Sequence, residues 1–232
     1  MTILDSSFLI PEWPAPAHIK ALVTTRDTGD MAKTTNNREL LSQHLKFKNK
    51  PVWLEQIHSN QVVNLDMAST TLKADASFTK KPESICVVLT ADCLPVLITN
   101  RQGNAVAAIH AGWRGLQAGI IDETIAQLKV APADLLAWLG PAIGPDHFEV
   151  GAEVRELYIS KNPDFDSCFT SNDNGRYLAD LYKLARINLQ YCGVNQVFGG
   201  GLCTYCEPKR FYSYRREKSD YGRMASLIWM VK

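Results

Sequence analysis

The sequence predicts a single α/β domain in which mixed β-sheets are flanked by helices. Short apolar runs typical of buried strands recur along the chain, and stretches with helical spacing of apolar residues lie among them. Several neighbouring runs are joined by turns too short for a helical crossover, which favours mixed sheets of the α+β kind over a regular doubly wound fold. The 232 residues suffice for a substantial core, and no linker or repeat divides them. We therefore expect one domain over residues 1–232.

The first part of the chain contains one clear strand and two weaker ones. Residues 19–25 (IKALVTT) predict a strand, and a polar loop then leads to a short helix near residues 38–45. Residues 51–54 and 61–65 are short strand candidates. Ser59-Asn60 between them is typical of a turn, so we interpret these two strands as a hairpin.

The middle of the chain holds the most apolar strands. Runs at 85–90, 94–99 and 105–110 predict three buried strands, and residues 101–104 (RQGN) form the turn between the last two. A helix is expected after His110, because one face is marked at helical spacing by Leu116, Ile120, Thr124 and Leu128.

The last part of the chain predicts further strands and two helices. Residues 135–139 form a buried strand, and helices are expected over 149–159 and 178–191, with Gly193 as a C-cap of the second. Three more strands would complete the sheets, at 197–201, 211–215 and 225–231.

Composition and charge exclude several classes of function. The formal net charge is +1 and hydrophobic residues make up 46%, so neither nucleic acid nor an acidic membrane surface is an expected partner. No apolar run reaches the length of a membrane span, and the N-terminus lacks the basic region of a secretory signal. Six cysteines in a large, core-rich chain without such a signal favour reduced thiols in the cytoplasm.

Three residues are suited to bind a soft or borderline metal ion: His58, Cys93 and His110. Cys93 and His110 follow apolar runs, and strand ends are where a sheet exposes side chains to a cleft. One cysteine and two histidines suit Zn²⁺, and three protein ligands leave one coordination position open, as in catalytic sites. A metal-free alternative makes Cys93 a nucleophile and His110 its base. A third alternative gives these side chains ordinary packing roles.

Copper is the less favoured metal. Two histidines and one cysteine also form a blue-copper set, but such a site needs a weak axial ligand such as methionine, and none of the five methionines lies beside these residues. A multicopper oxidase needs a further cluster built from many imidazoles, and the chain has only five histidines. Oxidase chemistry of that kind is therefore not expected.

Other charged residues are candidates for handling protons and anions. Asp92 directly precedes Cys93 and could hydrogen-bond a ligand histidine, and Asp75 is a nearby carboxylate that would equally cap a turn. Arg26, Arg114 and Arg215 are candidates for binding phosphate, because a guanidinium matches its oxygens with paired hydrogen bonds. An ordinary surface position is the alternative for each arginine.

Four further features have a structural or a chemical interpretation. Cys203-Thr204-Tyr205-Cys206 has the spacing of a redox pair or of half a zinc site, but without a second such pair we prefer structural thiols. The basic segment 209–218 predicts an exposed edge strand, with an anion site as the alternative. His147 lies in a turn and is expected to be solvated. Gly112 and Gly115 beside Arg114 would let the backbone approach an anion.

Taken together, these segments resemble one family. VWLEQIHSNQVV, KADASFT, VVLTADCLPVLI, AAIHAGWRG, WLGPAIGP with FEVG, and CTYCEPKRFYSYRREKSDYGRMASLIW follow that family's order from residue 52 to the C-terminus. The joint occurrence of ADCLP and HAGWRG is the most specific part. The chain thus resembles the YfiH-like family, long labelled laccase-domain or polyphenol oxidase proteins and now understood as purine nucleoside phosphorylases. Residues 27–37 depart from the family's pattern, which bears on Arg26 beside them.

The resemblance implies a YfiH-like fold and one catalytic zinc held by His58, Cys93 and His110. It implies phosphorolysis of adenosine, inosine and S-methyl-5′-thioadenosine, so that purine nucleosides and phosphate are the expected partners. It also implies adenosine deamination as a second activity, and a role in editing peptidoglycan precursors that carry a wrong first amino acid. The chain itself is expected to be a monomer or a weak homo-oligomer.

Three hypotheses follow, in order of preference. The first is a zinc-dependent purine nucleoside phosphorylase, with Asp92 as the candidate proton shuttle of the deamination and with phosphate held by Arg114, Arg26 or Arg215. The second is a metal-free hydrolase that uses Cys93 and His110. The third is a partner-binding protein without enzymatic activity.

Overall fold

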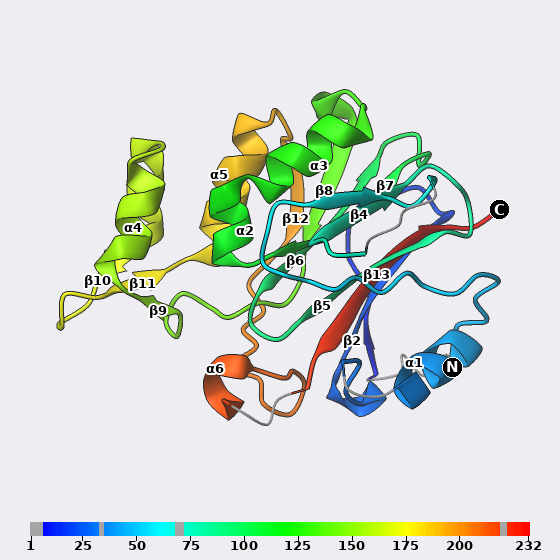
Figure 1. Ribbon diagram of the computed structural model, residues 1–232, viewed down its shortest axis with the longest axis horizontal. Helices are drawn as coiled ribbons and strands as arrows, with labels where there is room; N and C mark the ends of the chain where they lie inside the picture. The colour runs from blue at the N-terminus through cyan, green and yellow to red at the C-terminus, as the bar shows by residue number, and fades with distance from the viewer. Residues whose placement is uncertain (1–6, 33–34, 68–71, 219–221) are drawn as a thin grey trace.

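The central strands bury both of their faces, in keeping with their apolar sequences. In the computed structural model, which describes residues 7–32, 35–67, 72–218 and 222–232, one mixed sheet has the strand order β12-β8-β6-β7-β4-β3 (Figure 1). The β3–β4 and β8–β12 pairs are parallel, and the pairs between them are antiparallel. The strands are β3 Val62–Asn64, β4 Ala76–Thr79, β6 Leu94–Asn100, β7 Val106–Ala111, β8 Leu135–Leu139 and β12 Gln196–Gly199.

A second sheet, antiparallel throughout, lies against the first in the order β1-β2-β13-β5. Because successive side chains of a strand point to opposite faces, each sheet contributes side chains to a core on both of its sides. Leu97 of β6 packs between the two sheets, whereas its neighbours Val96 and Ile98 pack toward the helices. The strands are β1 Phe8–Leu9, β2 Ile19–Thr24, β5 Ile85–Thr90 and β13 Met224–Met230.

Helices cover the outer faces of both sheets. Leu116, Ile120 and Leu184 join the core on the outer side of the larger sheet, and Leu41 packs on the outer side of the smaller one. The resulting layers are helix, sheet, sheet and helix (Figure 1). The helices are α1 Thr35–His44, α2 Trp113–Ala118, α3 Ile120–Leu128, α4 Ala152–Ile159, α5 Leu181–Tyr191 and α6 Tyr214–Glu217, with short 3-10 turns at Arg26–Thr28, Pro132–Asp134 and Pro163–Cys168.

A small three-stranded sheet, in the order β10-β11-β9, lies with α4 to one side of the main layers (Figure 1). Its strands are β9 Glu149–Val150, β10 Phe169–Ser171 and β11 Tyr177–Ala179. In the described part of the chain, no helix is long and apolar enough to cross a membrane.

The predicted fold class, a mixed α/β domain with helices flanking its sheets, is confirmed. The strands expected at 19–25, 85–90, 94–99, 105–110 and 135–139 correspond to β2, β5, β6, β7 and β8. The predicted helix near 38–45 corresponds to α1, which begins earlier. β12 and β13 bear out the strands expected at 197–201 and 225–231.

The predicted hairpin of 51–54 with 61–65 is wrong. Val62–Asn64 pairs in parallel with β4, and Val52 bridges Cys86 instead. The polar residues between them form a loop whose amides are held by the buried carboxylate of Asp75, so the turn signal at Ser59-Asn60 marks this loop and not a strand reversal.

Three predicted helices need correction. The helix expected after His110 is divided at Gly119, whose φ of 86° lies in the left-handed region. The helices expected from 149 and 178 each begin after a short strand, and the side chain of Asp180 caps α5 by accepting from the amide of Lys183. The Cys192 end of α5 is followed by Gly193 at φ 84°, the position expected for a terminating glycine.

The strand expected at 211–215 is wrong. Ser213 caps α6 by accepting from the amide of Arg216, and Phe211 to Ser213 do not pair with a strand. The guanidinium of Arg216 donates a hydrogen bond to the carbonyl of Phe211, so that carbonyl bonds to a side chain and not to a neighbouring strand. Phe211 is buried in the core between the sheets, Tyr212 lies against the guanidinium of Arg26, and Tyr214 is exposed, so the alternating aromatics do not mark a strand edge.

Candidate metal centre

Three side chains from separate parts of the chain meet at one point. His58 lies in the loop before β3, Cys93 precedes β6, and His110 is near the end of β7. One potential ligand atom from each lies within 4.8 Å of those of the other two. The Cys93 sulfur is 3.9 Å from Nε2 of His58, and the two imidazole rings are 4.8 Å apart, nearly perpendicular. The structure thus brings together the three residues that the sequence suggested as ligands.

The position of Cys93 follows from the two-sheet architecture. β5 belongs to the smaller sheet and β6 to the larger one, so residues 91–93 cross from one sheet to the other. Asp92 has a φ of 86° in this crossing, an uncommon conformation for a residue with a side chain. The chain therefore leaves both sheets at Cys93, and its sulfur is half-buried where the sheets part.

A fully buried carboxylate, Asp75, organises two of the three ligands. Its oxygens accept from the amides of His58 (2.9 Å) and Ser59 (2.6 Å), from the Ser59 hydroxyl (2.8 Å) and, more weakly, from the amide of Ile57 (3.3 Å). Oδ1 also lies 2.8 Å from Nδ1 of His110, and because a carboxylate can only accept, that nitrogen carries the proton. Nε2 of His110 is then the ring nitrogen that remains available to bind a metal.

Asp75 has both of the roles that its sequence position allows. It lies near the candidate site, where it contacts His110, and it holds the turn at Ser59. Asp92 was the other candidate for bonding a ligand histidine, but its oxygens accept from the Thr204 hydroxyl (2.6 Å) and from the amide of Arg215 (2.6 Å). The sequence carries no signal that separates the two carboxylates, because Asp75 is placed by the pairing of β4, which it precedes, with the strand of His110.

The electrostatics of the metal-free site favour a thiolate beside an imidazolium. Burial alone raises the pKa of Cys93, but the charge of His110 and hydrogen bonds from both histidines outweigh it and lower this pKa to about 6. Burial lowers the pKa of His110, yet the Cys93 charge and the Asp75 hydrogen bond raise it to about 9. Burial raises the pKa of Asp75, and its hydrogen bonds to His110 and Ser59 bring it down to about 2. A deprotonated sulfur is the form that binds a metal or attacks a substrate.

Glycine at position 112 leaves room for the three ligands. A Cβ there would lie 3.0 Å from the Cys93 sulfur and 3.3 Å from Cδ2 of His58. Any residue can adopt the backbone conformation of Gly112, at φ −68° and ψ 162°. An alanine there would therefore crowd its neighbours without straining the backbone.

We therefore expect Gly112→Ala to lower the metal affinity about tenfold or more while the protein still folds. Isothermal titration with Zn²⁺ measures the affinity, and thermal unfolding of the metal-free protein checks the fold. Gln117→Ala, on the same helix but outside the cavity lining, is the matched control. Unchanged zinc affinity in the Gly112 variant would show that the ligands have more room than the geometry allows.

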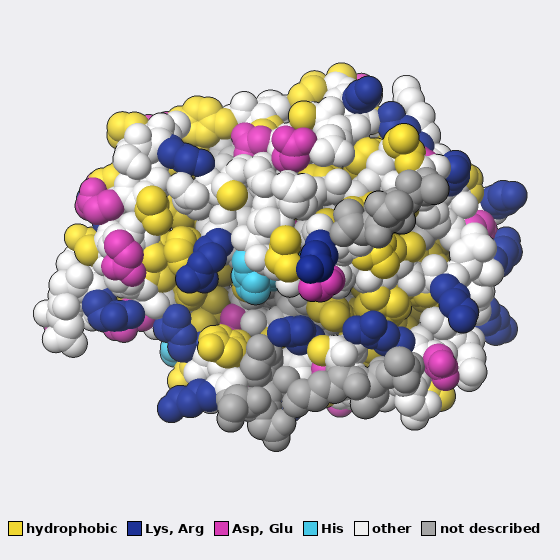
Figure 2. Space-filling model, in the orientation of Figure 1, with side chains coloured by type: hydrophobic (Ala, Val, Ile, Leu, Met, Phe, Trp, Pro, Cys, Tyr) yellow, Lys and Arg dark blue, Asp and Glu magenta, His cyan; other side chains and the backbone are white. Residues whose placement is uncertain are grey.

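The three ligands line a cavity of about 640 Å³, a volume typical of small-molecule sites. Figure 2 shows an exposed histidine on this face with Lys or Arg side chains on both sides of it. The lining combines cationic and aromatic groups, which suit an anion and a flat ring: Arg38, Arg114, Arg215, Arg223, Trp113, Phe148 and Tyr214.

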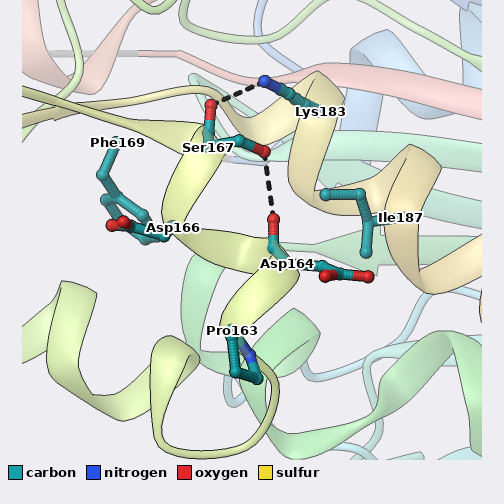
Figure 3. Close-up of a pocket in the computed structure, with 7 residues that line it drawn as sticks. All are labelled: Pro163, Asp164, Asp166, Ser167, Phe169, Lys183 and Ile187. Carbon is teal, nitrogen blue, oxygen red and sulfur yellow. Dashed lines mark hydrogen bonds between the residues drawn. The ribbon is translucent and has the colours of Figure 1, made fainter.

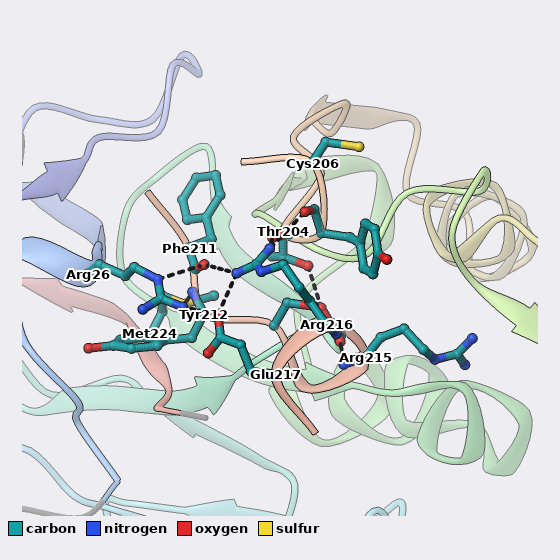
Figure 4. A network of polar contacts seen from close by, with 12 residues as sticks. Arg26, Thr204, Cys206, Phe211, Tyr212, Arg215, Arg216, Glu217 and Met224 are labelled. Carbon is teal, nitrogen blue, oxygen red and sulfur yellow. Dashed lines mark hydrogen bonds and ion pairs between the residues drawn. The ribbon is translucent and has the colours of Figure 1, made fainter. Parts of the chain in front are cut away.

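Two of the three arginines proposed for phosphate line this cavity. Within the described residues, the guanidinium of Arg114 makes no hydrogen bond or ion pair and only stacks on the Trp113 ring at 4.2 Å. Arg215 donates to the carbonyl of Glu149 (3.0 Å) from an exposed position. Arg26 is placed elsewhere: it forms an ion pair with Glu217 and is not among the lining residues. Figure 4 shows Arg26 and Arg215 at opposite ends of one polar network.

The remaining candidates lie beside the cavity or away from it. His147 is half-buried and stacks on Tyr205 with ring centres 4.2 Å apart, rather than being fully solvated. Cys203 and Cys206 are free thiols, as are the other cysteines. A second, more open hollow lies at α5, where Lys183 already donates to the carbonyl of Ser167 at 2.6 Å, and neither histidine nor cysteine lines it (Figure 3).

Comparison with known proteins identifies the family. A family model described as "Multi-copper polyphenol oxidoreductase laccase" matches residues 18–231. The chain belongs to this laccase family. The resemblance seen in the ADCLP and HAGWRG segments is thereby confirmed.

Relatives within the laccase family match nearly the whole chain. A purine nucleoside phosphorylase of Pseudomonas aeruginosa is 45% identical, over 97% of this chain and 99% of its own length. The purine nucleoside phosphorylase YfiH of Escherichia coli is 44% identical, over 97% of this chain and all of its own. A crystal structure of a Neisseria meningitidis protein superposes with a TM-score of 0.88 at 44% identity, covering 97% of this chain and 100% of that one.

In the described part of this laccase-family chain, the histidines and cysteines do not gather into a multi-copper centre. Among the described residues, His58, Cys93 and His110 are the group of histidine, cysteine and acidic side chains close enough to hold an ion. Three ligands with one thiolate fit a single borderline ion such as zinc, and the buried Asp75 completes the arrangement by orienting His110. The other histidines contact partners elsewhere, which leaves none for a further cluster: His18, His44 and His147.

Proposed function

We propose that this chain is a zinc-dependent purine nucleoside phosphorylase that acts on adenosine, inosine and S-methyl-5′-thioadenosine. The observation that carries the proposal is the convergence of His58, Cys93 and His110 in a cavity that also presents cationic and aromatic side chains. The names of the full-length relatives support the reaction, since they are purine nucleoside phosphorylases at 44–45% identity.

The reaction needs an anion and a nucleoside held in fixed relation. An oxygen of phosphate forms a bond to the anomeric carbon of the sugar while the bond to the purine nitrogen breaks, and the purine leaves with a proton. Arg114 and Arg215 bind the phosphate, because both line the cavity and Arg114 has no other anionic partner among the described residues. Trp113 and Phe148 provide apolar surface for the purine ring.

The metal would complete this site. Zinc held by His58, Cys93 and His110 supplies a Lewis acid next to the substrate. Asp75 keeps the proton on Nδ1 of His110 and holds the backbone of the His58 loop, which keeps both imidazoles beside the Cys93 sulfur. We include adenosine deamination as a second reaction at this centre, in which water replaces the purine amino group. Asp92 does not enter this proposal as a proton shuttle, because Thr204 and Arg215 already donate to both of its oxygens.

One observation favours the second hypothesis, a metal-free cysteine hydrolase. Cys93, His110 and Asp75 are arranged in space as a nucleophile, its base and the carboxylate that orients the base. The lowered pKa of Cys93 also suits a nucleophile. In that case the thiolate would attack a substrate carbonyl directly. The presence or absence of a stoichiometric metal in protein purified without chelator separates the two hypotheses.

The deciding experiment supplies inosine with and without inorganic phosphate. We expect hypoxanthine and ribose 1-phosphate to appear only with phosphate, and one zinc per chain to be found by elemental analysis. Dialysis against a chelator should remove the activity, and added zinc should restore it. Activity that survives complete metal removal, together with rapid alkylation of Cys93, would replace this proposal with the hydrolase.

Arg114→Ala tests the phosphate site. A charge-assisted, paired hydrogen bond contributes about 2 kcal/mol, so the KM for phosphate should rise about 10- to 100-fold, with a smaller change in the KM for inosine. Arg26→Ala is the matched control and should leave the phosphate KM near that of the parent, because Arg26 lies outside the cavity lining. If Arg26→Ala raised the phosphate KM more than Arg114→Ala, the phosphate would have to bind at the Arg26 end of the network in Figure 4.

We further propose that the protein works in a reducing compartment such as the cytoplasm. All six cysteines are free, and the pKa of Cys93 leaves its thiol open to oxidation when no metal protects it.

A further inference from the structure

Cys203 and Cys206 share one helical turn beside the candidate metal centre. The amide of Glu207 donates to the carbonyl of Cys203 (3.2 Å), and the amide of Cys206 donates to the Cys203 sulfur (3.4 Å). Side chains three residues apart in such a turn lie on the same side, and the contact of the Cys206 amide with the Cys203 sulfur places the two side chains next to each other. A disulfide between them would therefore need only a small movement.

The two sulfurs differ in exposure in the way a reactive pair requires. Cys206 is exposed, and Figure 4 shows its side chain directed away from the polar network. Cys203 is half-buried, and its sulfur also accepts from the amide of Gly144 (3.2 Å). An oxidant can thus reach one sulfur from solvent while the other is held in place behind it.

The residues between the two cysteines are joined to the cavity wall. Thr204 is fully buried and donates its hydroxyl to Asp92 (2.6 Å), the residue before Cys93. The other oxygen of Asp92 accepts from the amide of Arg215 (2.6 Å), at the start of α6. Arg216 donates to the carbonyls of Thr204 (2.6 Å) and Tyr205 (2.7 Å). The Cys203–Cys206 turn is thereby connected both to residues 91–93, which carry Cys93, and to α6, which carries Arg215 (Figure 4).

We propose that Cys203 and Cys206 form a reversible dithiol site, oxidised by hydroperoxides, and that its disulfide loosens the contacts of Thr204 with Asp92 and of Asp92 with Arg215. A disulfide holds its two sulfurs at about 2 Å, much closer than two separate thiols can approach. The Cys203 sulfur must leave the amides of Gly144 and Cys206 to reach that distance, and Thr204 moves with the closing ring.

The chemical step balances with one hydroperoxide. The sulfur of Cys206 attacks an oxygen of hydrogen peroxide, the O–O bond breaks, and the leaving hydroxide takes the thiol proton to become water. The sulfur of Cys203 then attacks the resulting sulfenic sulfur, an S–S bond forms, and a second water leaves with the remaining thiol proton. Two thiols and one peroxide give one disulfide and two waters, and a dithiol reductant reverses the change.

The test treats the reduced, metal-containing protein with hydrogen peroxide, blocks the remaining thiols by alkylation and digests the product with trypsin. The peptide 187–209 contains Cys192, Cys203 and Cys206. We expect it to carry an internal disulfide, about 2 Da lighter than its dithiol form, that dithiothreitol removes. The disulfide should form in Cys192→Ala and be absent in Cys206→Ser.

Hydrogen exchange measures the coupling to the cavity. After oxidation, the amides of residues 214–217 should exchange at least about threefold faster in the parent protein and remain unchanged in Cys206→Ser. Absence of the disulfide, or a disulfide that leaves this exchange unchanged, would overturn the inference. An effect of oxidation on the phosphate KM rests on the proposed function. If the reduced protein performs no phosphorolysis, that function fails, and the mass and exchange measurements still decide the inference.

Discussion

Cys93→Ala is expected to lose its bound metal and its phosphorolysis together. Cys93 is the only thiolate among the three ligand residues, and two imidazoles alone hold zinc poorly. The zinc affinity should fall at least about 100-fold, since a structural zinc site gains several kcal/mol from each ligand. Elemental analysis and the release of hypoxanthine from inosine, measured on the same samples, check both parts of the expectation.

Two controls separate metal binding from folding and from thiol chemistry. Cys192→Ala removes a half-buried thiol that lies beside Asp122 and outside the cavity lining, and it should keep both zinc and activity. Circular dichroism of Cys93→Ala should match that of the metal-free parent protein. If Cys93→Ala kept stoichiometric zinc and full activity, the ion would have to be bound elsewhere, and the proposed site would be wrong.

Asp75→Asn should weaken both the metal site and the fold. The buried carboxylate accepts from the His58 and Ser59 amides and from His110, and an amide side chain has one acceptor oxygen and turns two hydrogens toward those donors. We expect zinc affinity to fall about 10- to 100-fold, as for other residues that orient a ligand histidine. The free energy of unfolding should fall by about 2–3 kcal/mol, because buried donors lose their partner.

Ser59→Ala is the matched control for this prediction. It removes one neutral donor to Asp75 and leaves the charge and the His110 contact in place. Its free energy of unfolding should fall by about 1 kcal/mol, and its zinc affinity should stay close to that of the parent protein. Urea unfolding with and without zinc measures both effects. Equal losses in the two variants would mean that Asp75 acts only as a turn cap and does not orient His110.

Two of the three candidate ligands, Cys93 and His110, were predictable because each lies beside a recognisable signal. Cys93 and His110 follow apolar runs that form buried strands, and a buried strand must release its next residue near an edge of the sheet. His58 had no such support, since its loop was interpreted as a hairpin turn. Its residue type and its place in the QIHS segment pointed to it, and neither is a geometric argument.

The roles of the charged residues were less predictable, because they depend on which distant groups meet. Asp75 and Asp92 are both candidates for a hydrogen bond near the ligands, and nothing in the sequence ranks one above the other. The fold brings Asp75 against His110 and directs Asp92 to Thr204 and Arg215. Arg26 and Arg215 also looked alike, and only the second lines the cavity.

The amino-acid pattern by itself determined the mixed α/β class, most of the strands and the kinds of atom available to bind an ion. Those properties arise from local periodicity and residue chemistry, which a linear chain already contains. The tertiary structure decided that β5 and β6 lie in different sheets, so that Cys93 sits in the crossing between them. It also decided which carboxylate orients His110, because hydrogen bonds between residues 35 positions apart exist only after the sheets have paired.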